Sequence, residues 1–238
     1  MEDLSPQALA EELGDRPVRS YPALLSTEAD ALAWARSGAP EGAVVVADYQ
    51  ASPRGRSGLA WQVGEPGRGL GFSLVLRPSL PPEREGWLYT VAVSGLADAV
   101  GGGDAGVVWP DEVVVDGKRA AAVGVQVGLG PQSTEWAVAT FLAVDAEPPR
   151  APLLAEIVGA VERRYAMPPE DVIADYRQRC VTLGRKVRAL LLPMGPAGPK
   201  VEGLAVDTFD DGALLFETPS GARVAVRPQN LGKLEESL

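Results

Sequence analysis

The chain has 238 residues, of which 46% are hydrophobic and 23% charged, so it has a globular composition and is long enough to bury a sizeable core. Its 32 acidic and 22 basic residues give a net charge of −10, which argues against nucleic acid as a partner, because such binding needs a basic surface. With no histidine and one cysteine, the chain excludes Ser-His-Asp and Cys-His catalysis, transition-metal sites of the histidine or cysteine kind, and an internal disulfide.

The first quarter of the chain predicts one short amphipathic stretch, one helix and one buried strand. The acidic start Met1–Asp3 lacks the basic and apolar regions of a signal peptide, and no apolar run of about 18 residues follows, so we expect a cytoplasmic protein that does not insert into a membrane. Pro6–Leu13 is amphipathic. Thr27–Ser37 is expected to be a helix with Ser26 as its N-cap, and Val44–Ala47 a buried strand.

The central part predicts an antiparallel arrangement of strands interrupted by one apolar helix. Strands are expected at Leu70–Leu76, Val107–Trp109, Val113–Val115, Arg119–Val127 and Trp136–Val144. Trp87–Val100 is rich in Ala, Val and Leu and predicts a helix that ends at Gly101–Gly103. Asp116-Gly117 is typical of a two-residue hairpin turn.

The last third predicts two helices and then a change of character. Leu153–Tyr165 and Pro168–Leu183 have helical patterns. After Gly184, short strands separated by Gly and Pro turns are expected at Lys186–Leu192, Val201–Thr208, Gly212–Glu217 and Arg223–Val226. We therefore predict an α+β fold in which a mixed β-sheet backed by helices (residues 1–184) is followed by a small C-terminal β-barrel domain (residues 185–238).

The segment Tyr49–Trp61, called the arginine loop from here on, is the most informative part of the sequence. It places Arg54 and Arg56 two residues apart among Gly, Ser and Pro, and planar guanidinium groups suit phosphate and carboxylate ligands. A loop of this composition at the end of a strand predicts an anion site, although a solvated hairpin tip has the same composition. Because Pro53 restricts the backbone, we expect Arg54–Ser57 to be ordered without a ligand.

Several motifs resemble those of biotin–protein ligases over about residues 20–235. The arginine loop is similar to the family's biotin-binding pattern Y-Q-x-x-G-R-G-R-x-G-x-x-W and departs from it at Pro53. Ser26-Thr27 resembles the S-T of S-T-N, and Gly69–Pro78 the family's second core strand. Val108–Val113 resembles K-W-P-N-D-V, and Asp116–Val123 resembles D-G-R-K-L-A-G-I.

The resemblance implies a two-step reaction in which the carboxylate of biotin attacks ATP and a lysine of an acceptor carrier protein then takes the acyl group. It implies biotin and Mg-ATP as ligands, a small carboxylate as the bound substrate, and also a homodimer. By position it assigns a carboxylate- and phosphate-binding role to Arg54 and Arg56, and the place of the catalytic lysine to Arg119. The remaining implied contacts are Ser26, Thr27, Gln50, Gly55, Trp61 and Ala122 for the ligand and Trp109, Asp111 and Glu112 for the nucleotide.

Five departures fall in this one implied site. Val108 stands where the family has a lysine, Asp111 where it has an asparagine, and Ala122 where it has a glycine, while Arg119 replaces a lysine. Ala139–Ala143 replaces G-I-G-I-N, and Phe141 is expected to narrow the pocket.

Three interpretations therefore stay open. The chain is an ordinary biotin ligase, or it acts on another carboxylate through related chemistry that is impaired or altered, or it is a non-catalytic ligand-binding or regulatory paralogue. The retained arginines favour the enzyme, and the lost lysine and glycines favour the binding protein.

Overall fold

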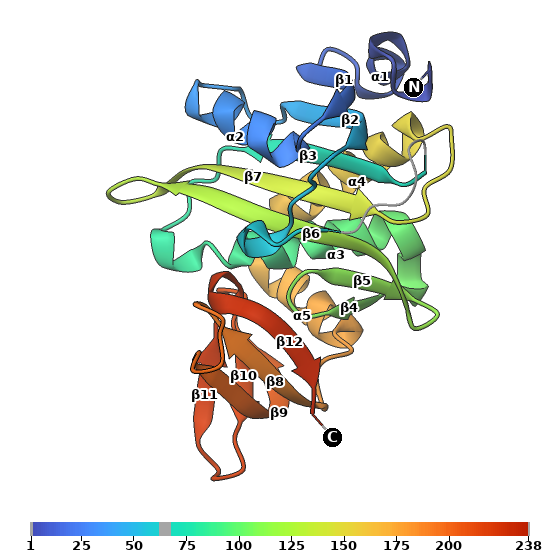
Figure 1. Cartoon of the computed structure of the whole chain (residues 1–238). Coiled ribbons are helices and arrows are strands. Elements are labelled where there is room, and N and C mark those ends of the chain that lie inside the picture. The colour runs from blue at the N-terminus through green and yellow to red at the C-terminus, as the bar shows by residue number, and fades with distance from the viewer. Residues whose placement is uncertain (1, 62–67, 238) are drawn as a thin grey trace.

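The computed structural model describes residues 2–61 and 68–237, whose strands form two sheets (Figure 1). The first sheet has seven strands in the order β1-β2-β3-β7-β6-β5-β4. All neighbouring strands are antiparallel except β1 and β2, which are parallel. These strands are β1 (Val18–Leu24), β2 (Val44–Gln50), β3 (Leu70–Leu76), β4 (Gly106–Val108), β5 (Glu112–Val115), β6 (Lys118–Leu129) and β7 (Thr134–Ala143).

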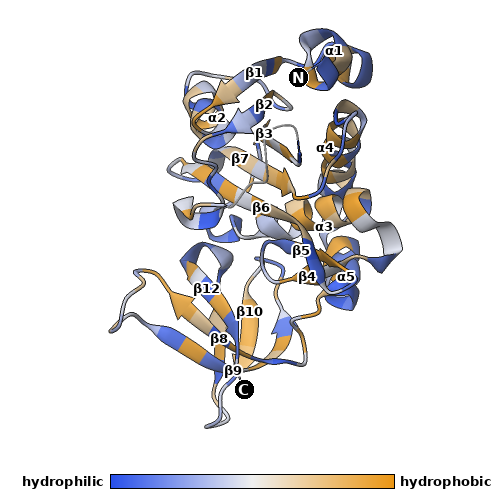
Figure 2. Cartoon of the chain, turned by 45° about the vertical axis from the view of Figure 1, so that its right-hand side comes forward, coloured by the Kyte–Doolittle hydropathy of each residue, from blue (hydrophilic) through white to orange (hydrophobic). Residues whose placement is uncertain are grey.

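Helices cover both faces of this sheet. The helices are α1 (Pro6–Leu13), α2 (Thr27–Arg36), α3 (Trp87–Gly101), α4 (Ala151–Ala166) and α5 (Pro169–Arg179). The larger hydrophobic core joins α3, α4 and α5 to one face, and hydrophobic residues are prominent on α3 and α4 in Figure 2. Small residues of α2 pack on the opposite face against β2, β3 and β7. No helix of the described residues is long and apolar enough to cross a membrane.

The second sheet is antiparallel, with the order β11-β10-β9-β8-β12. Its strands are β8 (Lys186–Leu191), β9 (Lys200–Thr208), β10 (Leu214–Glu217), β11 (Arg223–Val226) and β12 (Leu231–Glu236). The α+β class is thus confirmed, with a mixed sheet, helical layers and a C-terminal antiparallel β unit. The division into two domains at residue 184 stays a prediction.

Helix α5 and strand β2 end at other residues than the sequence predicts. Helix α5 ends at Arg179 and not at Leu183, because Cys180 has an extended backbone and forms a bridge with Val107. Strand β2 continues through Gln50, so the first two residues of the arginine loop belong to the sheet. This extension fixes the position of Gln50 beneath the loop.

The second sheet contacts the first next to the arginine loop. The buried indole of Trp109 donates a hydrogen bond from Nε1 to the carbonyl oxygen of Gly212, at 2.9 Å. Arg177 on α5 donates to the carbonyl oxygen of Thr208, at 2.6 Å. The turn between β9 and β10 is therefore held against the turn between β4 and β5, where the implied nucleotide contacts lie.

Candidate functional site

The arginine loop lies directly on the first sheet. The amide of Gly55 donates to the carbonyl oxygen of Leu59 at 2.8 Å, and the amide of Trp61 donates to the carbonyl oxygen of Pro53 at 3.0 Å. Beneath the loop, a Cβ placed on Gly124 of β6 would come within 2.6 Å of the carbonyl carbon of Gly55. The two glycines therefore let the backbones touch, and the indole of Trp61 covers Gly55 from the other side.

These contacts predict a loop that is ordered in the absence of ligand. The amides of Gly55, Gly58 and Trp61 all donate within the loop, so their hydrogen exchange in the ligand-free protein should be slower than that of an open glycine-rich loop by about tenfold or more. Exchange followed by mass spectrometry over residues 51–61 tests this. Exchange at the rate of an unstructured peptide would contradict it.

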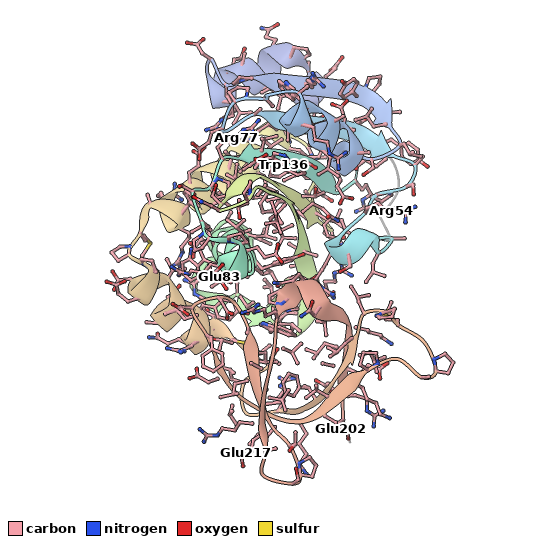
Figure 3. All side chains as sticks on the ribbon, turned by 90° about the vertical axis from the view of Figure 1, so that its left-hand side faces the viewer. Arg54, Arg77, Glu83, Trp136, Glu202 and Glu217 are labelled. Carbon is pink, nitrogen blue, oxygen red and sulfur yellow. The ribbon has the colours of Figure 1, made fainter. Side chains whose placement is uncertain are left out.

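The two arginines of the loop have different surroundings. Arg54 is exposed on the outer side of the loop and donates to the carbonyl oxygen of Gly58 at 3.0 Å (Figure 3). Arg56 is 7% exposed, and its Nε donates to Oδ2 of Asp111 at 2.8 Å. Its Nη1 also donates to the carbonyl oxygens of Leu231 and Gly232 in β12. Arg54 is thus available to a ligand, whereas Arg56 joins the loop to both sheets.

Asp111 is the buried carboxylate of this arrangement. Burial raises its pKa to about 6, and the neighbouring Glu112 adds to that rise, although the guanidinium of Arg56 acts in the opposite direction. The ion pair therefore does not fully offset the loss of water around Asp111.

A chain of buried polar groups lies on the face of the sheet under the loop, and we call it the polar floor: Ser26, Thr27, Gln50, Ser73 and Thr140. Gln50 accepts hydrogen bonds at Oε1 from the amide and the hydroxyl of Thr27, at 2.8 and 3.1 Å. Ser73 donates to the Thr27 hydroxyl at 3.0 Å and lies 2.8 Å from that of Thr140.

The end of the polar floor at Ser26 is incomplete. Ser26 begins helix α2 but makes no side-chain capping bond, and its buried Oγ has no hydrogen-bond partner. A buried hydroxyl without a partner is unfavourable, so a polar ligand atom next to it would be stabilised. Ser73 and Thr140 escaped the sequence analysis because they lie in the middle of apolar strands. Because side chains alternate between the two faces of a strand, their positions in β3 and β7 could have placed both hydroxyls on the α2 face.

A cavity of about 400 Å³ opens where the arginine loop, the β4–β5 turn and β12 meet. Six of the residues that the resemblance implies line this cavity: Arg56, Trp61, Trp109, Asp111, Glu112 and Arg119. Val108 is also in its wall. Arg119 lies 3.4 Å from Glu112 and its side chain is 39% exposed, so it can turn toward a ligand. The structure thus brings together one polar floor and one charged cavity, both bordered by the arginine loop.

Comparisons with known proteins give relatives in sequence and in fold. No family model matches the chain. It is 29% identical to a biotin–[acetyl-CoA-carboxylase] ligase of Mycobacterium tuberculosis, over 84% of this chain and 82% of that protein. It is 28% identical to a bifunctional ligase/repressor BirA of Bacillus subtilis, over 84% of this chain and 69% of that protein. These similarities support membership of the biotin–protein ligase superfamily.

Solved structures of biotin–protein ligases have the same fold. The ligand-free enzyme of Aquifex aeolicus aligns with a TM-score of 0.70 and 16% identity, over 93% of this chain and all of that one. The same enzyme in complex with biotin and ATP aligns with a TM-score of 0.69 and 19% identity, over 93% of this chain and 99% of that one.

Within the biotin–protein ligase fold, two of the sequence departures have different consequences. Ala122 is buried opposite Leu142, on the face covered by the arginine loop, where the family pattern has glycine. The expectation that Phe141 narrows the pocket is wrong. Its ring stacks on Phe72, with centroids 5.0 Å apart, in the core on the helical face, because neighbouring residues of a strand point to opposite faces.

Proposed function

We propose that this protein is biotin–protein-ligase-like: it binds a small carboxylate, biotin or another acid, on the polar floor and ATP in the cavity next to it, with weakened acyl-adenylate chemistry. The relatives support the two ligands, because their names include biotin ligation and a complex with biotin and ATP. The observation on which the proposal rests is that one loop borders both the polar floor and the charged cavity.

The chemistry is the attack of the carboxylate oxygen on the α-phosphorus of ATP, which releases pyrophosphate and forms an acyl-adenylate. The amine of a lysine on an acceptor carrier protein then attacks the acyl carbon, forms an amide and releases AMP. Both reactants are anions, so cations must offset their repulsion and align them. Arg54 at the loop surface and Arg119 in the cavity can serve in this way. The polar floor would orient the other end of the acid through the side-chain amide of Gln50 and the hydroxyl of Ser26.

Magnesium would accompany ATP, but the described residues offer it no preformed site. The two carboxylates of the cavity, Asp111 and Glu112, are each next to an arginine, and the described part of the chain holds no group of three acidic, histidine or cysteine side chains that could bind a metal. We therefore assign no magnesium ligand. When bound, the ion supplies neutralisation of the phosphate charge.

A second candidate is a non-catalytic binding or regulatory paralogue. Two observations favour it: Val108 places an apolar side chain in the cavity wall, and Arg56 is engaged with Asp111 and β12 instead of being available to a phosphate. Both candidates bind ligand, and only the first forms an acyl-adenylate.

Biotin-dependent exchange of pyrophosphate into ATP separates the two candidates. We expect very weak exchange in the parent protein and no recovery with Val108→Lys alone, because Ala122 and the Arg56–Asp111 pair remain. The triple variant Val108→Lys, Asp111→Asn, Ala122→Gly should exceed the parent by about 100-fold, the usual effect of one well-placed charged group on a developing anion.

Calorimetry with biotin, other carboxylic acids and ATP completes the test. Binding without exchange in either protein supports the non-catalytic paralogue. Strong exchange by the parent contradicts weakened chemistry, and failure to bind ATP and every acid contradicts the proposal as a whole.

A further inference from the structure

Lys233 is a cation of the second sheet that lines the same cavity as Val108. It lies near the start of β12, with its side chain 64% exposed and its Nζ 2.8 Å from Oε1 of Glu235. The resemblance does not assign it a role, because the matched motifs that form the cavity all lie between residues 49 and 123. The fold therefore places a lysine at this cavity that the sequence motifs did not predict.

The backbone next to Lys233 is held firmly toward the cavity. The pairing of β12 with β8 shifts its register between Leu231 and Lys233, and a shift of this kind redirects the side chains of a strand. Arg56 donates to the carbonyl oxygens of Leu231 and Gly232 at this point. The side chain of Met194 leaves no space for a Cβ on Gly232. The loop arginine thus fixes the strand immediately before Lys233.

Of the three cations that line the cavity, Lys233 has the most exposed side chain, at 64% against 39% for Arg119 and 8% for Arg56. Arg56 is bound to the buried Asp111, and Arg119 lies next to Glu112 in the same wall. The partner of Lys233 is Glu235 in the same strand, and an exposed lysine–glutamate pair contributes little to stability. Its flexible four-carbon stem allows the ammonium group to move to an anion. With three cations and two carboxylates lining it, the cavity has a formal charge of +1.

We propose that Lys233 binds the phosphates of ATP and supplies the cation that Val108 does not. The inference rests on the proposed function, since it assigns a residue to the same nucleotide site. It assigns to β12 a direct part in ligand binding, with Arg56 as the positioning residue that holds the strand.

The test is calorimetric binding of ATP with magnesium, and of adenosine, to Lys233→Ala and Lys233→Glu. We expect Lys233→Ala to weaken ATP binding about fivefold or more and Lys233→Glu to weaken it further, as loss of a hydrogen-bonded charged contact predicts. Adenosine, which has no phosphate, should bind all variants as it binds the parent. Lys200→Ala, an exposed lysine of the same sheet outside this cavity, is the matched control.

A rescue variant tests whether the two positions serve the same phosphates. Val108→Lys in the Lys233→Ala background should recover at least half of the lost ATP affinity on a logarithmic scale. If the parent binds ATP and Lys233→Ala binds it equally well, this inference is overturned and the proposed function stands. If the parent binds no ATP, both are overturned. Equal weakening by Lys200→Ala, or weakened adenosine binding, would also overturn the assignment.

Discussion

Asp111→Asn should make the folded protein more stable at pH 7.5, by up to about 3 kcal/mol. Asp111 has a pKa of about 6 in the folded protein against 3.8 for an ordinary aspartate, and each pKa unit corresponds to about 1.4 kcal/mol. A raised carboxyl pKa means that the folded state favours the protonated form. The contribution of Asp111 to the free energy of unfolding is therefore fully present below about pH 4, and it is lost as the pH rises through 6. Asparagine resembles the protonated form at every pH.

Urea unfolding from pH 4.5 to pH 7.5 measures this effect. The advantage of Asp111→Asn should be largest at pH 7.5 and shrink as the pH is lowered through 6. The charged groups that act on Asp111 are Arg56, Glu112 and Arg119. A variant that is less stable than the parent at pH 7.5 would show that the ion pair outweighs burial.

Removing Arg56, the other partner of the ion pair, should lower the stability of the folded protein. Arg56→Ala leaves Asp111 buried without its cation and should cost about 3–5 kcal/mol at pH 7.5, a lowering of Tm of roughly 10 °C for a chain of this size. The double variant Arg56→Ala, Asp111→Asn should recover more than half of this loss. Arg54→Ala, an exposed arginine of the same loop, is the control and should change stability by less than about 0.5 kcal/mol.

Gly124→Ala should open the arginine loop. The added methyl group would lie 2.6–2.9 Å from backbone atoms of Gly55 and Arg56, which cannot move without releasing the loop from the sheet. We expect a loss of stability of about 1–3 kcal/mol, the usual effect of overpacking, and the loss of slow hydrogen exchange over residues 51–61. Gly103→Ala is the matched control, because a Cβ there meets nothing within 4 Å. Unchanged exchange in Gly124→Ala would show that the loop does not rest on β6.

The sequence predicted the elements with strong local patterns and missed those whose stability comes from distant partners. β3 and α3 have continuous apolar patterns and were predicted with little error. β1 contains Pro22 and polar residues, and it is a strand because β2 pairs with it in parallel. β12 is an edge strand with three charged residues, and it pairs with β8. No local pattern indicates such pairings.

The same distinction applies to the candidate site. The resemblance assigned the arginine loop and the β4–β5 turn to one site, and both line the same cavity. It did not predict that Arg56 would be bound by Asp111, 55 residues away, or by the backbone of β12, which is 175 and 176 residues away. Lys233 was missed for the same reason, because its role depends on where the second sheet docks.

Arg150 imposes an order on how this chain can fold during synthesis. Its buried guanidinium donates to Asp3 at 2.7 and 2.9 Å and to Asp48 at 2.5 Å, joining the first residues of the chain to a segment made 147 residues later. The strand that ends at Gln50 therefore gains this partner only after all seven strands of the first sheet have been synthesised. The N-terminal segment and the base of the arginine loop reach their final arrangement late, through a contact of long sequence separation that slows folding.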